Sequence, residues 1–213
     1  LKMLANFAPE QEFLLEPGDM LYLPPGWAHD GVADGECMTC SIGFRAPGRD
    51  ELAREVMQRA LDAADPEARG PLYRDPTLSA TTEPGRIPTA LQGFAADAVA
   101  RLLADPEALA CALGEVLSEP KRGVWFDHND TGDAEIDGTA LRLDQRTRAL
   151  YDDRHVFING ESFRAAGRDA RLMRRFFDAR ALAPREVAAL SADARSLLQE
   201  WLAAGWVRAV DDD

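Results

Sequence analysis

Two consecutive prolines, Pro24 and Pro25, constrain the first part of this chain more than any other feature of its sequence. Proline has no backbone N–H, so it cannot donate to the ladder of a β-sheet and usually ends a strand. The apolar run at 20–23 is therefore predicted to be a short strand that stops at a rigid corner. Pro17 and Gly18 predict a turn before this strand, because proline suits the first corner position and glycine tolerates a positive φ.

A second strand is predicted over residues 36–44, after a turn at Asp34 and Gly35. Two strands that flank a rigid corner are typical of part of a β-barrel or β-sandwich. His29 follows the corner directly, and a stiff backbone suits a side chain that must meet a metal ion or a substrate in a defined geometry. A lone histidine is nevertheless more often structural than a ligand, so the residue alone leaves both roles open.

The apolar residues change to a helical period after residue 48. Asp50 is predicted to cap a first helix, and an apolar stripe over 91–103 predicts a second one. Pro106 opens a third helix that is expected to end near Ser118. These helices are amphipathic, so they must pack on one another, on the β-part or on a second copy of the chain.

The residues after 120 predict another unit. Two strand-like segments, 147–151 and 155–159, flank a turn, and the pair Asn159 and Gly160 predicts a tight hairpin. A helix is expected next, with an apolar face over 172–177, and Pro184 is expected to begin another. A helix that ends at Gly205 and a strand over 206–210 complete the unit. Helices with a β-hairpin of this size are typical of a winged helix.

Residues 164–185 of this unit carry seven arginines against two aspartates. In a winged helix such a segment could contact nucleic acid, including RNA. The expected arrangement is instead an exposed helix face that pairs with the acidic remainder of the chain. Contact with RNA is therefore not favoured by the sequence.

Charge and cysteine content exclude several classes of protein. The net charge of −13 disfavours non-specific binding to nucleic acid and suits a basic partner, although it also serves solubility. Three cysteines, an odd number, argue against a disulfide framework and favour the reducing cytoplasm. No apolar run approaches the roughly 20 residues that span a bilayer, so no membrane attachment is expected.

The segment EPGDMLYLPPGWAHDG (16–31), followed by SIGFRAP (41–47), resembles the distal-histidine segment of the JmjC/cupin 2-oxoglutarate oxygenases. More narrowly, it is similar to the bacterial ribosomal oxygenases, which hydroxylate an arginine of a large-subunit ribosomal protein. The resemblance continues through the helical block and the winged-helix-like end, with ALYDDRHVFINGESF at 149–163. It therefore covers nearly the whole chain.

The resemblance implies an α+β fold in three parts. These are the distal half of a double-stranded β-helix (the JmjC/cupin barrel) over 1–48, a helical dimerisation domain over 49–120, and a winged-helix-like domain over 121–213. It also implies a basic ribosomal protein as substrate and a homodimer formed through the helical domain.

The family holds iron(II) with two histidines and one carboxylate, which leaves room for 2-oxoglutarate and oxygen. The resemblance makes His29 the distal histidine of this metal site. It also favours Ser41, with Thr39 on the same face of the predicted strand, as a contact of the 2-oxoglutarate carboxylates. Arg45 lies beyond the strand and is expected to form a salt bridge at the barrel rim.

The first histidine and the carboxylate come, in this family, from an H-x-D on a strand before the distal histidine. No H-x-D precedes His29 in these residues, so the chain by itself is expected to lack hydroxylase activity. His128, Asn129 and Asp130 spell H-x-D, but about a hundred residues after His29 and within an acidic segment. This triple is expected to be a solvated loop.

Two other candidates are weighed against structural roles. Cys37 and Cys40 form a C-x-x-C, but residues three apart on a strand point to opposite faces, and no second pair exists to complete a zinc site. Buried packing is therefore expected for both cysteines. His155, on a predicted strand of the wing, is expected to be a surface or packing residue.

The function predicted from the sequence is part of an iron(II)- and 2-oxoglutarate-dependent dioxygenase that hydroxylates a protein. The alternative is a non-catalytic module that dimerises through its helices and binds a partner through its winged helix. A winged-helix transcription regulator with a cupin-like sensor is disfavoured, because its DNA-binding face should be basic.

Overall fold

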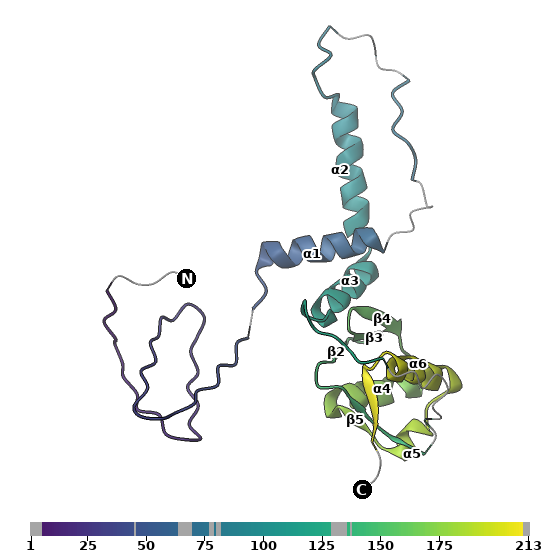
Figure 1. Cartoon of the computed structure of the whole chain (residues 1–213). Helices are drawn as coiled ribbons and strands as arrows, with labels where there is room; N and C mark the ends of the chain where they lie inside the picture. Colours follow the sequence, from purple (N-terminus) through teal and green to yellow (C-terminus); the bar gives the residue numbers. More distant parts are fainter. Residues whose placement is uncertain are drawn as a thin grey trace. The chain divides into compact units, whose positions relative to one another are not determined.

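The computed structural model describes residues 6–44, 46–63, 70–76, 79, 82–128, 136 and 138–210. The chain divides into two units, Leu1–Ala46 and Pro47–Asp213 (Figure 1). Within the described residues, no helix combines the length and the apolar character that a membrane span requires.

The turns of the first unit form as the sequence predicts. The Asp19 N–H donates to the Glu16 carbonyl at 3.0 Å, and Gly18 between them has a φ of 100°. At the proline corner, the Trp27 N–H lies 3.2 Å from the Pro24 carbonyl oxygen. Each turn spans four residues and closes with a hydrogen bond between its ends, so neither needs support from the rest of the chain.

The strands predicted over 20–23 and 36–44, and with them the half-barrel, are not formed in this structure. Residues 6–44 contain turns and extended chain but no strand, and all except Leu23 and Pro24 are exposed. Met20 and Phe44 are each 91% exposed. Short strands without further hydrogen-bonded neighbours bury too little apolar surface to offset the entropy lost on ordering them.

The second unit begins with the three predicted helices, α1 (Arg49–Asp62), α2 (Thr89–Leu103) and α3 (Pro106–Ser118). The expected cap at Asp50 is wrong, because the N-cap residue of α1 is Gly48 and Asp50 lies inside the first turn. The Asp50 carboxylate stabilises the helix there through the positive end of the helix dipole. Asp105 caps α3 through its side chain, which accepts from the Glu107 and Ala108 N–H groups.

Residues 138–210, all of which the structure describes, combine two three-stranded antiparallel sheets with three helices. The first sheet has the order β2 (Ala149–Tyr151), β3 (His155–Ile158), β4 (Glu161–Arg164), and the second has the order β5 (Ala181–Leu182), β1 (Ala140–Leu143), β6 (Val207–Val210). The helices are α4 (Gly167–Ala179), α5 (Pro184–Val187) and α6 (Ala192–Ala203). Asn159 and Gly160 both have positive φ, at 49° and 92°, which confirms the predicted hairpin between β3 and β4.

One apolar core lies among these elements, and Trp201 of α6 occupies it at 1% exposure. The Phe163 ring meets the Trp201 ring edge-on at 5.5 Å, and the Phe177 ring lies 6.0 Å from it on the side of α4. The predicted apolar face of α4 is confirmed, because Met173, Phe176 and Phe177 are all buried. By contrast, α2 contains no buried residue.

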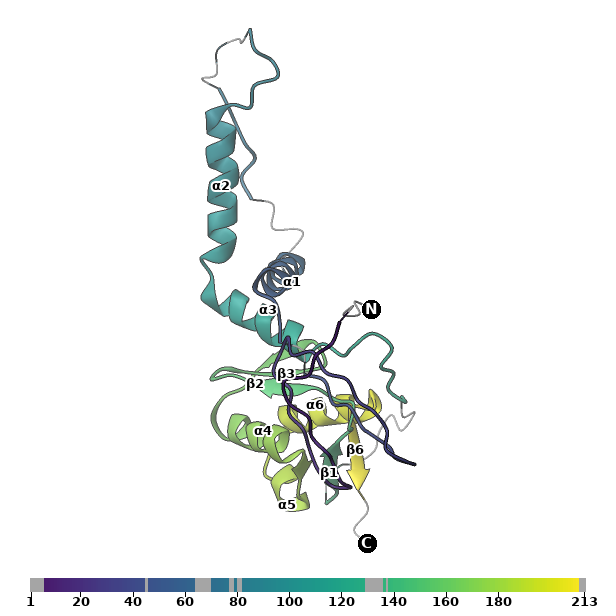
Figure 2. The ribbon, with the colours of Figure 1, turned by 90° about the vertical axis from the view of Figure 1, so that its left-hand side faces the viewer.

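The helix α3 packs against β2, β3 and β4, and α4 packs against β2 and β3. Figure 2 shows β2 and β3 between these two helices. The approach of α3 depends on Gly114, where a Cβ would overlap the ring of Phe157. The sheet of the wing is therefore held by α3 through a contact that only glycine permits.

Replacing Gly114 with alanine is expected to lower the free energy of unfolding by about 1–3 kcal/mol, because the new Cβ must displace the Phe157 ring. Gly93→Ala is the matched control, since nothing lies within 4 Å of its Cβ position on α2. That substitution should be neutral or stabilise the protein by up to about 1 kcal/mol. Urea unfolding followed by circular dichroism measures both, and equal effects would contradict the close packing.

Asp144, 4% exposed, joins the loop after β1 to the last strand. Its carboxylate accepts from the Arg146 Nε at 2.9 Å and pairs with Arg208 of β6. The hydrogen bond from the Arg146 side chain, which outweighs the effect of burial, lowers the pKa of Asp144 to about 2. Arg180 adds a hydrogen bond to the Asp144 carbonyl at 2.7 Å.

A depressed carboxyl pKa stabilises the folded state above the ordinary pKa of aspartate, and the gain disappears as the pH falls through about 2. Asp144→Asn should therefore cost about 2 kcal/mol of unfolding free energy at neutral pH and progressively less below pH of about 4. Asp153→Asn, at an exposed carboxylate, is the control and should have little effect. A pH-independent loss in the Asp144 variant would contradict the role of its charge.

Candidate functional site

His29 lies in the first unit, two residues beyond the Trp27 that closes the proline turn. Its side chain is exposed, and its Nδ1 lies 3.5 Å from the Trp27 carbonyl oxygen. A proton on Nδ1 can be donated to this carbonyl, which leaves Nε2 with a free electron pair directed away from the turn. The local chain therefore presents one ligating nitrogen from a defined corner.

Thr39 and Ser41 are exposed in the same unit, and neither forms a hydrogen bond with His29 within the described residues. Because residues 36–44 are not a strand here, the shared strand face predicted for the two hydroxyls is absent. Their expected contact with 2-oxoglutarate stays a prediction. Arg45 lies outside the described residues.

Metal-binding groups do not converge in the part of the chain that the structure describes. No group of three His, Cys, Asp or Glu side chains there has the arrangement of a metal site. His128 is exposed, with its Nδ1 3.4 Å from the Phe126 carbonyl oxygen, while Asn129 and Asp130 lie outside the described residues. His29 is thus a single candidate ligand rather than part of an assembled centre.

Cys37 and Cys40 are free thiols, and both are exposed. The expectation of buried packing for them is wrong in this structure. Burial of these side chains requires a strand packed against other segments, and residues 6–44 form no strand.

The sequence assigned His155 only a surface or packing role, and the structure places it in a polar cluster between α3 and the wing. The imidazole is 6% exposed. Its Nδ1 lies 3.4 Å from the Asp152 carboxylate, and its Nε2 lies 3.6 Å from the Cys111 Sγ and 3.7 Å from a Glu107 carboxylate oxygen. No sequence signal joins these residues, because two lie on α3, Asp152 lies between β2 and β3, and His155 begins β3.

The electrostatics of this cluster do not favour a nucleophile. Burial, followed by the negative charges of Glu115, Asp152 and Glu107, raises the pKa of the Cys111 thiol. Burial raises the pKa of Asp152. Hydrogen bonds from the backbone N–H groups of Arg154 and His155 act in the opposite direction and outweigh burial, so the pKa of Asp152 lies below its usual value. The thiol is therefore neutral near pH 7, and the cluster serves to hold α3 against the wing.

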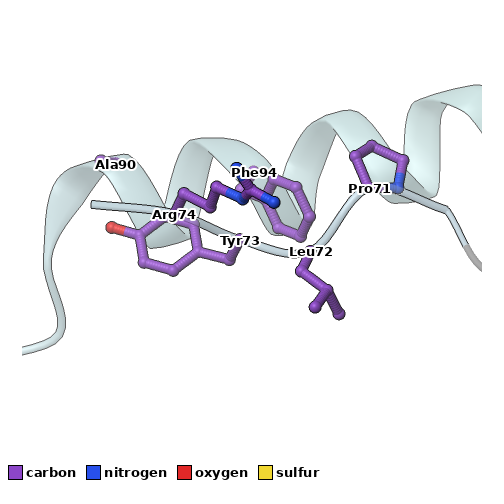
Figure 3. A pocket seen from close by; sticks show the side chains of 6 residues that line it. All are labelled: Pro71, Leu72, Tyr73, Arg74, Ala90 and Phe94. Carbon is purple, nitrogen blue, oxygen red and sulfur yellow. The ribbon is translucent and has the colours of Figure 1, made fainter. Parts of the chain in front are cut away.

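A hollow of about 490 Å³ lies between α2 and the segment that precedes it. Figure 3 shows the Tyr73 ring alongside α2 near Phe94, and the two rings meet edge-on at 5.6 Å. The hollow is lined by Pro71, Leu72, Tyr73, Arg74, Ala90 and Phe94. Its apolar walls and single cation are suited to a contact between chains rather than to a charged small molecule.

Known proteins match both ends of this chain. Residues 1–52 match the JmjC domain family, and residues 101–208 match the ROXA-like winged-helix family. The ribosomal protein uL16 3-hydroxylase of Escherichia coli is 30% identical over 167 residues, which are 73% of this chain and 43% of that protein. A probable ribosomal oxygenase of Haemophilus influenzae is 35% identical over 66 residues, which are 31% of this chain and 14% of the relative.

Solved structures of the Escherichia coli ribosomal oxygenase YcfD share the fold. Its complex with cobalt and succinic acid has a TM-score of 0.60 and 21% identity, over 79% of this chain and 48% of that one. Its complex with cobalt and 2-oxoglutarate has a TM-score of 0.60 and 20% identity, over 80% and 48%. This chain spans less than half the length of the relatives it matches. It belongs to the ROXA-like winged-helix family and carries JmjC-domain sequence at its N-terminal end.

Proposed function

We propose that this chain is part of an iron(II)- and 2-oxoglutarate-dependent hydroxylase that acts on an arginine of a large-subunit ribosomal protein. One observation carries the proposal: the JmjC match, with His29 inside it, and the ROXA-like winged helix occur in one chain. The relative named as a uL16 3-hydroxylase aligns with 73% of this chain. The arginine as target rests on the family resemblance of the PPGWAH segment.

The cofactors follow from the same relative, which was solved with cobalt and 2-oxoglutarate. Cobalt(II) has the charge of iron(II) and takes similar ligands, so it stands in for iron there. The described residues of this chain do not complete such a site, because His29 is a single ligand and no group of three is present among them. We therefore assign His29 one ligand position and derive no reaction step from these residues.

The charge of the chain supports a basic substrate. A net charge of −13 attracts a cationic protein and speeds its encounter with the enzyme. The alternative function, a non-catalytic module that dimerises and binds a partner, uses the same surfaces. It differs in one respect, because it requires no ligand role for His29.

His29→Ala in the full-length parent is expected to abolish turnover of 2-oxoglutarate, because one metal ligand is lost. The fold should persist, since the His29 side chain is exposed and no core volume is removed. His128→Ala is the matched control, because it removes an equally exposed imidazole. Turnover that survives in the first variant but not in the second would reassign the ligand to the H-x-D triple.

The helix α2 supports a homodimer. Its apolar side chains remain open to solvent, although a short amphipathic helix gains most of its stability from the face it buries. A second copy of the chain always offers the same face, so a two-fold contact can cover both. The exposed apolar residues of α2 are Leu91 (36%), Phe94 (38%), Val99 (51%) and Leu103 (45%).

Sedimentation at micromolar concentration is expected to show a species of twice 23.3 kDa. Phe94→Glu should shift it toward the monomer, because a charge then lies in the apolar contact. Gln92→Glu, on the same helix, adds the same charge at a polar position and should leave the dimer intact. A monomer in the unmodified chain, or a dimer that tolerates Phe94→Glu, contradicts this arrangement.

A further inference from the structure

The seven arginines of residues 164–185 divide into two groups in the structure. The first group is used within the chain: Arg174 donates to the Asp153 carbonyl at 2.6 Å, and Arg175 pairs with Glu186 at 2.8 Å. Arg180 donates to two carbonyl oxygens near β1. The second group has exposed side chains without an ion pair or hydrogen bond among the described residues, and consists of Arg164, Arg168, Arg171 and Arg185.

The two aspartates of the segment accept hydrogen bonds from other groups, and neither forms an ion pair with this second group among the described residues. Asp169 accepts from the Ser191 N–H at 3.1 Å and from the Ser191 hydroxyl at 2.7 Å. Asp178 accepts from the Tyr151 hydroxyl at 2.9 and 3.0 Å. The expected pairing of these arginines with acidic side chains is therefore confirmed only for Arg175, while Arg174 and Arg180 bind backbone carbonyl groups.

Three arginines of the second group lie within eight residues, and we call Arg164, Arg168 and Arg171 the arginine face. Arg168 and Arg171 are three apart on α4 and share one side of the helix. That side is opposite to the one that carries the buried residues Met173 and Phe177. Arg164 is the last residue of β4, and two residues separate it from the start of α4.

We propose that the arginine face binds the phosphate backbone of RNA. Guanidinium groups donate to phosphate oxygens in pairs, and such contacts need clustered cations but no apolar anchor. A protein partner would need such an anchor, because binding energy at protein interfaces comes mainly from buried aromatic and aliphatic side chains. No large apolar side chain of residues 164–185 is exposed, so the surface suits a polyanion better.

The choice of RNA over DNA rests on two points. The helix α6 follows the short helix α5 and exposes Asp193 and Glu200, so it is unsuited to enter the groove of a DNA duplex. The second point depends on the proposed function, because an enzyme that modifies a ribosomal protein meets its substrate close to RNA. The acidic remainder of the chain repels a polyanion and confines the contact to this face.

The test is fluorescence anisotropy of a labelled, unstructured oligouridine with the 213-residue chain over a series of salt concentrations. We expect weak, salt-dependent binding, with a Kd of about 10⁻⁴–10⁻⁶ M near physiological salt. Three phosphate contacts predict a slope of roughly −2 for the logarithm of the association constant against the logarithm of the salt concentration. Changing Arg164, Arg168 and Arg171 together to glutamine should lower affinity at least tenfold and remove most of this slope.

The matched control changes Arg49, Arg54 and Arg86 to glutamine, which alters the net charge by the same amount on other exposed positions. It should retain binding. Equal losses in the two triple variants, or no binding by the unmodified chain, would overturn the proposal. Tighter binding to duplex DNA, or to polyglutamate, would also overturn it, by assigning the face to DNA or to an acidic protein.

This experiment needs no turnover, so its result is independent of the hydroxylase assignment. If this chain binds RNA but the full-length parent protein is inactive, the RNA-binding role of the arginine face is supported and the proposed reaction is contradicted. If the parent turns over 2-oxoglutarate but this chain does not bind RNA, the proposed reaction is supported and the RNA-binding role is contradicted. Circular dichroism of both triple variants verifies that any loss of binding comes from the surface and not from the fold.

Discussion

The packing of the second unit depends on the absence of one side chain, at Gly114. Without a Cβ there, α3 lies directly on the Phe157 ring of β3. The same approach brings Cys111 and Glu107 of α3 to His155, so an apolar contact and a polar cluster hold the helix at neighbouring points. Since α1 packs on α3, the wing supports the helical part as well.

In the first unit, residues 6–44 have no neighbouring segment to pack against, and they form turns but no strand. Its turns close with hydrogen bonds between residues three apart, and they form as proline and glycine chemistry predicts. A strand ladder instead needs a neighbouring chain segment, and residues 6–44 form none. His29 is thus held at its corner by local chemistry, whereas a set of ligands around it requires a barrel that these residues alone do not build.

Charge is distributed in a way that neither the total of −13 nor the arginine count reveals. Asp144 is surrounded by cations and has its pKa lowered to about 2, chiefly by the hydrogen bond from Arg146. Three arginines near the end of α4 are engaged with backbone or with Glu186, while those near its start have no such partner among the described residues. Burial and distance, rather than composition, determine which charges remain available to a second molecule.

The sequence by itself determined the features that rest on local chemistry. Helix periodicity placed α1, α2 and α3, the Asn159–Gly160 pair placed the hairpin, and the PPGWAH segment pointed to the JmjC family before any fold was known. Tertiary structure alone decided the two short strands β1 and β5, the exposure of Cys37 and Cys40, and the cluster around His155. The physical reason is that these features depend on groups far apart in the chain, whose meeting is set by packing and not by any pattern of neighbouring residues.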